Sequence, residues 1–394
     1  ARTVSVSGPT TLKAEGPQGS IVVWSDETTS YFGQAKAGAQ GFIEVSSKGT
    51  LNLGGSTEVG AGGQILYDPT NIVIDATAPS SFYLDLADPT PAVDDVHGSK
   101  ATELTNGNIV VTAPYDDTGA TNGGAVRLYN GKTGALISAL TGTTANDLVG
   151  FTGVTALTNG NFVVTSHVWD NPLTAANVGA VTWVNGTSGF NGAVSATNSL
   201  VGDKSTDLVG LGGITALSNG NYVVLSHAWG FGVVNAVGAV TWGNGQVAGP
   251  RTVGAVSAAN SLVGSKAGDM MRTFATADTT VTALSNGHYV VSSPYWDNGA
   301  ATNVGAVTWG NGDAGTAGVI SATNSLVGGV ANDRVGLGGV KAVGNGNYVV
   351  GSPYANIAGV AAAGAVTWGN GTAVTADVVS AANSLVGTQA NDRS

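Results

Sequence analysis

Cysteine is absent from this sequence, and charged residues are scarce. Without cysteine the chain cannot form disulfide bridges, thiolate nucleophiles or thiolate metal sites. Lysine and arginine together number 14 among 394 residues, against 25 aspartate and glutamate residues, which gives a formal net charge of −11. Binding to phosphate groups requires clustered basic side chains, so we expect no nucleic-acid partner and no attraction to an anionic membrane surface.

Long apolar runs and helical periodicity are also missing. No stretch of 18 or more apolar residues occurs, so we expect no membrane insertion. No window keeps an apolar period of 3.6 residues, which argues against long amphipathic helices. The first residues, Ala1 to Val4, lack the pattern of a signal peptide, and we expect both ends of the sequence to be interior parts of a longer protein.

The sequence is rich in glycine, with 61 residues, and in internal repetition. One Asn-Gly pair between two apolar runs marks each of five copies, with separations of 53, 60, 67 and 59 residues, and an aspartate marks the boundaries between copies. The asparagines of these pairs are Asn106, Asn159, Asn219, Asn286 and Asn345. The boundary aspartates are Asp95, Asp147, Asp207, Asp269, Asp333 and Asp392. Self-similarity at a period near 60 residues predicts an array of five structural repeats.

Each copy contains three clear strand patterns and a weaker fourth one. The first two flank the Asn-Gly pair, and this pair between two apolar runs predicts a hairpin with a type I′ turn. The third strand reads Gly-Ala-Val-Thr-Trp in four copies, and the fourth lies in segments such as 379–387. Four short strands per unit predict the blade of a β-propeller. The four tryptophans of the third strand are expected to pack between blades, with ligand stacking as the alternative: Trp183, Trp242, Trp309 and Trp368.

Two segments of the repeat carry a family resemblance. Val349–Tyr354 and Gly364–Val366, with Asn332–Gly336 between copies, resemble the FG-GAP repeats of integrin-α-type β-propellers. That resemblance implies a ring, commonly of seven blades, and in many members a calcium site in an Asp-rich loop between the first two strands. The equivalent loops here contain no carboxylate, so we do not carry the calcium site over. The five copies either close a ring or belong to a longer array.

Residues 1–75 differ from the repeats and show short strand patterns about every 20 residues, punctuated by glycines. This predicts the rungs of a right-handed β-solenoid, with a small sandwich as the alternative. Ile21–Asp26, Gly41–Gly49 and Ile65–Ile74 resemble, in order and spacing, the last turns of the β-helix in filamentous-haemagglutinin-type exoproteins. Those proteins are secreted adhesins exported by two-partner secretion, so the resemblance implies an extracellular protein at the bacterial cell surface.

The expected organisation is therefore all-β, with three parts. Residues 1–75 form a terminal segment of a β-solenoid, residues 76–94 form a linker rich in proline and serine, and residues 95–394 form a five-repeat β-propeller. An insertion in the third copy, residues 270–276, is expected on a loop.

One loop in each copy, directly after the second strand, varies and carries aromatic and acidic side chains. Equivalent loops of a propeller gather on one face, where aromatic rings beside aspartates suit a glycan or a surface receptor. The candidate ligand-binding residues are Tyr115, Asp116, Trp169, Asp170, Trp229, Tyr295, Trp296, Asp297 and Tyr354. The alternative is that these rings fill gaps between blades.

Other candidate sites do not support catalysis. His167 and His227 occupy equivalent positions in adjacent copies, where they either bind a metal ion or hydrogen-bond within their loops. Each boundary aspartate is expected to cap a turn rather than bind a metal. No glutamate follows Glu103, and no nucleophile elbow, phosphate-binding loop or His-Glu-x-x-His motif occurs. We therefore expect no enzyme activity and no cofactor.

The sequence thus predicts a non-enzymatic fragment of a secreted bacterial surface adhesin, whose propeller loops bind a glycan or surface receptor. The alternative is a structural subunit of an extracellular filament or biofilm matrix that associates with copies of itself. Low charge, abundant glycine and exposed strand edges suit such self-association.

Overall fold

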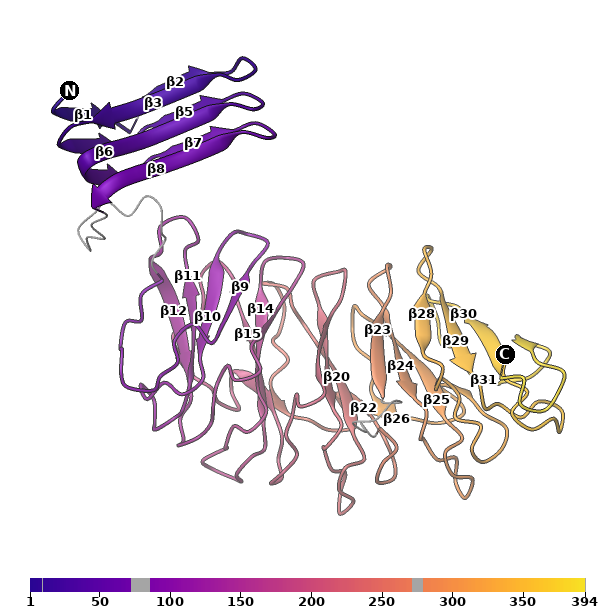
Figure 1. The fold of residues 1–394 in the computed structure, drawn as a ribbon. Coiled ribbons are helices and arrows are strands. Elements are labelled where there is room, and N and C mark those ends of the chain that lie inside the picture. Colours follow the sequence, from indigo (N-terminus) through magenta and orange to yellow (C-terminus); the bar gives the residue numbers. More distant parts are fainter. Residues whose placement is uncertain (9, 72–85, 271–278, 394) are drawn as a thin grey trace. The chain divides into compact units, whose positions relative to one another are not determined.

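A computed structural model describes residues 1–8, 10–71, 86–270 and 279–393, and this part of the chain is all-β. The chain divides into two compact units, Ala1–Ala87 and Asp88–Ser394, which are coloured in sequence order in Figure 1. None of the described residues forms a helix that could cross a membrane. Residues 88–94, which the sequence analysis assigns to the linker, lie in the second unit, and residues 271–276 of the expected insertion fall outside the described residues.

The first unit is built from strands that pair in parallel with a strand further along the chain. In most of these pairs the partner lies 22 residues ahead, as in Ser20 with Phe42 and Phe42 with Gln64. The strands of one sheet are β1 (Thr3–Val6), β3 (Ser20–Ser25), β4 (Thr28–Tyr31), β6 (Phe42–Leu53) and β8 (Gln64–Asn71). Those of the other are β2 (Thr11–Ala14), β5 (Gln34–Ala37) and β7 (Ser56–Val59).

The strands of this unit bury one apolar interior, and glycines mark their corners. Tyr31, Ile43 and Val45 are fully buried in it. A Cβ atom on Gly55 would clash with the carbonyl oxygen of Gly33, so this corner requires glycine.

The second unit contains five sheets, one for each repeat, which follow one another in chain order (Figure 1). Repeat 1 contains β9 (Lys100–Glu103), β10 (Ile109–Ala113), β11 (Ala125–Tyr129) and β12 (Leu136–Thr141). Repeat 2 contains β13 (Val154–Ala156), β14 (Phe162–Ser166), β15 (Ala180–Val184), β16 (Gly192–Ala193) and β17 (Ser199–Val201). Repeat 3 contains β18 (Gly213–Ala216), β19 (Tyr222–Ser226), β20 (Ala239–Gly243), β21 (Gly254–Ala255) and β22 (Ser261–Val263). Repeat 4 contains β23 (Thr280–Ala283), β24 (Tyr289–Ser293), β25 (Ala306–Gly310), β26 (Gly318–Val319) and β27 (Leu326–Val327). Repeat 5 contains β28 (Val340–Ala342), β29 (Tyr348–Ser352), β30 (Ala365–Gly369), β31 (Asp377–Val378) and β32 (Ser384–Val386).

A two-residue strand connects each sheet to the repeat before it. β16 of repeat 2 lies parallel to β12 of repeat 1, with Leu140 opposite Gly192. β21, β26 and β31 add in the same way to the sheets of repeats 2, 3 and 4. Four antiparallel strands of each repeat are therefore extended by a fifth strand that belongs to the next repeat, except in repeat 5.

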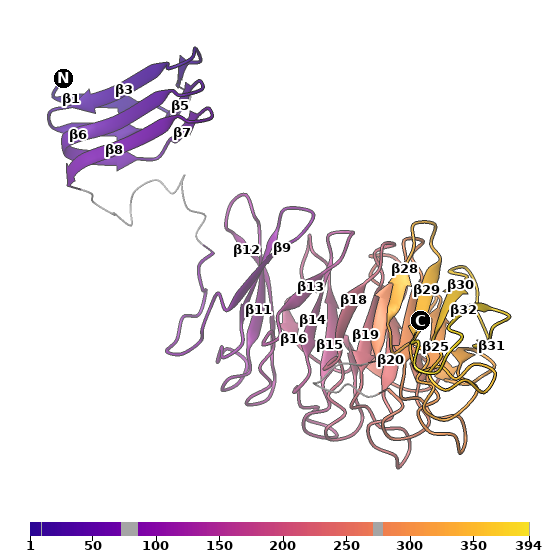
Figure 2. The ribbon, with the colours of Figure 1, turned by 45° about the vertical axis from the view of Figure 1, so that its right-hand side comes forward.

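The described residues do not form a closed ring. Repeats 1 and 5 lie at opposite ends of the array in both views (Figures 1 and 2). The hairpins at the Asn-Gly pairs are present, but the expected type I′ turn is wrong. Only the glycine has a positive φ, 83° at Gly107, and its N–H donates to the carbonyl of Leu104 at 2.8 Å. This is the longer hairpin loop in which glycine alone takes the left-handed conformation.

The apolar core lies between consecutive sheets, because both faces of the second and third strands are covered in repeats 2 to 4. Val164 of β14 packs towards repeat 1, and its neighbour Val163 packs towards repeat 3. Such strands consist mostly of apolar residues, since neither face is exposed to water, with buried hydroxyl residues such as Thr165 and Ser166 among them. The expected packing of the third-strand tryptophans between repeats is confirmed for Trp183, Trp242 and Trp309.

Candidate functional site

The tryptophans of the variable loops lie between the repeats. Trp169, Trp229 and Trp296 are only 1%, 3% and 3% exposed, and each belongs to an apolar cluster that joins two sheets. Their rings therefore fill the gaps between neighbouring repeats and offer no open surface to a sugar ring.

The loop aspartates at the next position hold the backbone of their own loops. The Oδ1 atom of Asp170 accepts the N–H of Asn177 at 2.6 Å, and that of Asp297 accepts the N–H of Asn303 at 2.7 Å. Both asparagines have a positive φ, which explains why the loop needs a fixed acceptor there. The structure thus gives these two candidate residues a loop-shaping role.

The three candidate tyrosines reach the surface. Tyr115 is exposed and lies edge-on to Phe151, with 6.5 Å between ring centroids. Tyr295 and Tyr354 belong to adjacent repeats, and the guanidinium of Arg334 lies over both rings, 5.6 and 5.7 Å from their centroids. We call these last three side chains the Tyr–Arg stack.

The arginine of this stack was not among the candidate residues predicted from the sequence. Arg334 follows a boundary aspartate, at the position where the second and third copies have Leu148 and Leu208. A second arginine at the equivalent position, Arg393, lies 5.1 Å from the ring of Tyr354. The sequence did contain a signal for this stack, because arginine replaces leucine at a position close to loops that carry tyrosine. These replacements place two cations against aromatic faces.

Consecutive repeats are joined by a shared backbone acceptor. The side-chain N–H groups of Asn159 and Asn161, and the indole N–H of Trp183, all donate to the carbonyl of Gly245, at 2.8, 2.9 and 3.0 Å. The three donors belong to repeat 2 and the acceptor to repeat 3. The Asn-Gly-Asn turn and the strand tryptophan therefore form one contact point with the next repeat.

The same contact recurs along the array with small changes. In repeat 3, Asn219, Asn221 and Trp242 donate to Gly312. In repeat 4, Asn286 and Trp309 donate to Gly371, because His288 replaces the second asparagine. In repeat 1, Asn106 and Asn108 donate to Gly186, because Leu128 replaces the tryptophan.

The boundary aspartates cap their turns, as the sequence predicts, and the four between consecutive repeats also bind the next loop: Asp147, Asp207, Asp269 and Asp333. The Oδ2 atom of Asp147 accepts the N–H groups of Thr143 and Thr144, both at 2.7 Å. Its Oδ1 atom accepts the N–H of Asp170, which belongs to the loop of repeat 2, at 2.9 Å. Burial raises the pKa of Asp147, although these hydrogen bonds and others favour its charged form.

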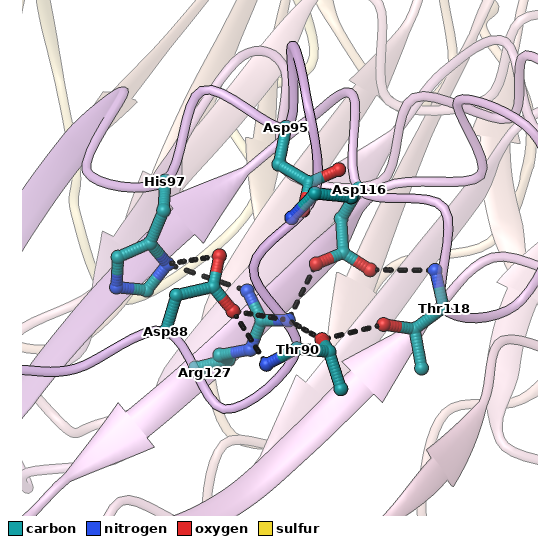
Figure 3. A network of polar contacts seen from close by, with 8 residues as sticks. Asp88, Thr90, Asp95, His97, Asp116, Thr118 and Arg127 are labelled. Carbon is teal, nitrogen blue, oxygen red and sulfur yellow. Dashed lines mark hydrogen bonds and ion pairs between the residues drawn. The ribbon is translucent and has the colours of Figure 1, made fainter.

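A buried ionic cluster covers the outer side of repeat 1 (Figure 3). The guanidinium of Arg127 on β11 forms ion pairs with Asp88, at 3.2 Å, and with Asp116. It also donates to the hydroxyl of Thr90 at 2.9 Å and contacts His97 at 3.3 Å. We call residues 88–97 the N-terminal cap, because they lie over the outer face of the first sheet.

This cluster brings three carboxylates together, from Asp88, Asp95 and Asp116, with oxygen atoms within 4.8 Å of one another. The fully buried Arg127 already pairs with two of them, so a fixed cation takes the place that a metal ion would need. Burial acts to raise the pKa of Asp116, but the bonds from Thr118 and the pairing with Arg127 outweigh it and lower this pKa. Asp116, a candidate ligand-binding residue, therefore belongs to the ionic cluster that holds the N-terminal cap.

No other cluster of potential metal ligands occurs among the described residues. Burial lowers the pKa of His167, which favours its neutral form. A depression of about 270 Å³ lies between repeats 3 and 4, and its lining contains only glycine, threonine and aliphatic residues. It holds no titratable group for acid–base chemistry.

The fold and contacts define an all-β repeat protein whose units are linked through shared strands and shared hydrogen bonds. The sequence matches a family described as a repeat of unknown function, DUF5650, five times, at residues 103–151, 156–211, 216–273, 283–337 and 342–394. These matches cover more than half of the chain, so the chain belongs to this family. The match is to neither FG-GAP repeats nor filamentous haemagglutinin. No curated protein matches the sequence.

Proposed function

We propose that this chain is a non-enzymatic part of a secreted bacterial surface protein, in which the repeat array displays loops for adhesion. The observation that carries the proposal is the linkage between repeats, through the glycine carbonyl, the boundary aspartate and the shared strand. Such linkage favours a stiff support for surface loops. Two depressions of the array are lined only by glycine, threonine and aliphatic residues.

The relationships to known folds are part of this proposal. The four antiparallel strands of each repeat support a blade like those of FG-GAP propellers, arranged here as an open array. The 22-residue parallel register of the first unit supports a β-solenoid of the filamentous-haemagglutinin type. Export by two-partner secretion and a place at the cell surface follow from that second relationship. Protease treatment of intact cells tests them, because a surface protein is cleaved and an internal one is protected.

The ligand surface we propose is the Tyr–Arg stack of repeats 4 and 5. The Nε atom of Arg334 has no hydrogen-bond partner among the described residues, and the flanking rings are partly exposed. A guanidinium between aromatic faces suits a glycan that carries a carboxylate, because the rings contact the sugar face and the arginine pairs with the acid.

A glycan array followed by calorimetry tests this surface. We expect the chain to bind acidic glycans and Arg334→Leu to bind at least about tenfold more weakly, the loss of one charge-assisted contact. Leucine occupies the equivalent position after two other boundary aspartates, as Leu148 and Leu208. We therefore expect this variant to retain the fold. Tyr115→Ala, at the far end of the array, is the matched control. Equal binding by Arg334→Leu, or no glycan binding at all, would contradict the proposed surface.

The alternative function is a structural subunit that associates with copies of itself. The exposed edge of β32 favours it, since an unpaired strand can add another strand. Light scattering over a range of concentrations distinguishes the two functions. Growth into polymers would favour the structural subunit, whereas a constant monomer mass would favour display.

A further inference from the structure

The last sheet exposes the side chains that other repeats bury. Val366, Trp368 and Leu385 of repeat 5 are 37%, 56% and 78% exposed. The valines and leucines at the same positions in repeats 2 to 4 are all at most 1% exposed: Val181, Val240, Val307, Leu200, Leu262 and Leu326. Their burial comes from the following repeat, so the outer face of repeat 5 is an interface without its partner. We call it the open face.

Hydrogen-bond donors on the open face also lack the partner that their counterparts have in other repeats. In repeats 2 and 3 the two turn asparagines and the strand tryptophan converge on a glycine carbonyl of the next repeat. The equivalent N–H groups of Asn345, Asn347 and Trp368 have no acceptor among the described residues. Three donors are thus arranged for one carbonyl oxygen.

The edge of β32 and the last boundary aspartate, Asp392, also lack partners that their counterparts have. β32 pairs with β30, whereas its counterparts in repeats 1 to 4 also pair with a two-residue strand of the next repeat. Asp392 caps its turn through Oδ2, at 2.9 Å from the N–H of Thr388. Its Oδ1 atom has no partner in the described part of the chain, although that of Asp333 accepts the N–H of Asn356.

We propose that the open face is a docking surface for one further repeat of the same kind, following repeat 5 in tandem. That repeat supplies a two-residue strand parallel to β32, a glycine carbonyl for the three donors and a loop N–H for Asp392. It also supplies an aromatic ring like Tyr222, which packs against the valine and leucine of repeat 2. The inference comes from contacts seen at the other interfaces and does not depend on the proposed adhesive function.

A second copy of this chain does not meet these requirements at its first repeat. Repeat 1 has no two-residue strand between β11 and β12, so it has nothing to add to β32. The N-terminal cap also covers the face that would have to dock, and Arg127 holds this cap through Asp88 and Thr90. Docking a copy head to tail would therefore require the loss of a buried ionic cluster.

Extending the chain by one repeat tests the proposal. A copy of residues 334–394 is joined after Asp392, and hydrogen exchange is measured by mass spectrometry on the peptide that contains β32. We expect exchange of residues 384–387 to slow by at least about tenfold in the extended chain, because their amides and carbonyls then lie within a sheet. Repeats 1 to 3 serve as the internal reference, since their exchange is expected to stay unchanged.

The substitution Leu385→Asp gives the matched control in both chains. In the original chain this exposed position tolerates aspartate, and the thermal midpoint stays unchanged. In the extended chain the buried carboxylate abolishes the added protection, while the reference repeats remain folded. Two results would overturn the proposal: an extended chain whose β32 exchanges as fast as before, or an original chain that forms dimers which Leu385→Asp dissociates. The second result would identify a copy of this chain as the occupant.

Discussion

The two outer faces of the repeat array are made from equivalent strands but end in different ways. On repeat 1 the N-terminal cap lies over β11, and Arg127 replaces the threonine that stands at this position in the other repeats. On repeat 5 the outer face keeps the apolar and amide side chains of an internal interface, and no described residue covers them. The comparison shows that the capped repeat departs in sequence from the internal repeats, as terminal repeats generally do, whereas repeat 5 keeps their pattern.

The largest effect is expected from breaking the capped end. Arg127→Met leaves Asp88 and Asp116 buried without their cation, so we expect a loss of about 3–5 kcal/mol in the free energy of unfolding. Urea denaturation of the second unit measures this loss. Arg334→Met, in which the lost arginine stacks on partly exposed rings, is the control and should cost about 1 kcal/mol or less. Equal losses for the two variants would mean that the cap is not held by its ionic cluster.

Two equivalent tryptophans give the next largest contrast. Trp309→Ala removes an indole that packs on repeat 5 and donates to Gly371 at 2.9 Å, so we expect a cost of about 2–4 kcal/mol. Trp368→Ala removes the counterpart on the open face, which is mostly exposed, and should cost about 1 kcal/mol or less. Thermal and urea unfolding of both variants give the comparison. If Trp368→Ala costs as much as Trp309→Ala, the open face is covered in solution.

The turn asparagines should show a smaller contrast of the same kind. Asn221 accepts the N–H of Gly245 in its own repeat and donates to Gly312 of the next one. Asn347 makes only the first of these bonds, with Gly371. We expect Asn221→Ala to cost about 1 kcal/mol more than Asn347→Ala, the value of one additional buried hydrogen bond. Denaturant titrations of both variants at one temperature measure this difference. Identical midpoints for the two variants would argue against the shared acceptor.

The smallest expected effect is on the pH dependence of stability. The pKa of Asp116 is lowered in the folded state, so its contribution is present above about pH 4 and is lost as the pH falls through the folded pKa. The pKa of Asp147 is raised, so its contribution grows as the pH falls through that higher folded pKa. Asp116→Asn should therefore flatten the loss of stability in acid, whereas Asp147→Asn should steepen it. Urea midpoints between pH 3 and 6 measure both slopes, and a steeper slope for Asp116→Asn would contradict the cap electrostatics.

The repeat number and the strands could be predicted from the sequence because their signals are local and occur five times. Asn-Gly pairs, boundary aspartates and the Ala-Val-Thr-Trp strand each recur with few changes. The burial of Trp169 could not be predicted in the same way, because the strand pattern does not say on which side of the following turn a side chain lies. An indole beside an aspartate reads equally well as a binding platform and as packing between sheets.

The N-terminal cap was missed because it depends on contacts between distant residues that occur once. Asp88 lies in a stretch that resembles a linker, and its partner Arg127 lies 39 residues further on. A signal was nevertheless present, since repeat 1 departs from the other copies at two positions at once. It has an acid, Asp116, where repeats 2 to 4 have tryptophan, and a base, Arg127, where the others have threonine. When an acidic and a basic residue both replace the usual residues of a repeat, they indicate an ion pair between the two positions.

The strand that each repeat gives to its predecessor has a consequence for how such chains can grow. An internal repeat both receives and gives a strand, so a duplicated copy fits between its neighbours without any change in sequence. Repeat 1 receives β16 but has no strand to give, so a copy of it placed inside the array would leave the preceding sheet one strand short. Duplicating an internal repeat, or adding a repeat at the open face, therefore lengthens this array with every sheet complete, whereas inserting a copy of repeat 1 does not.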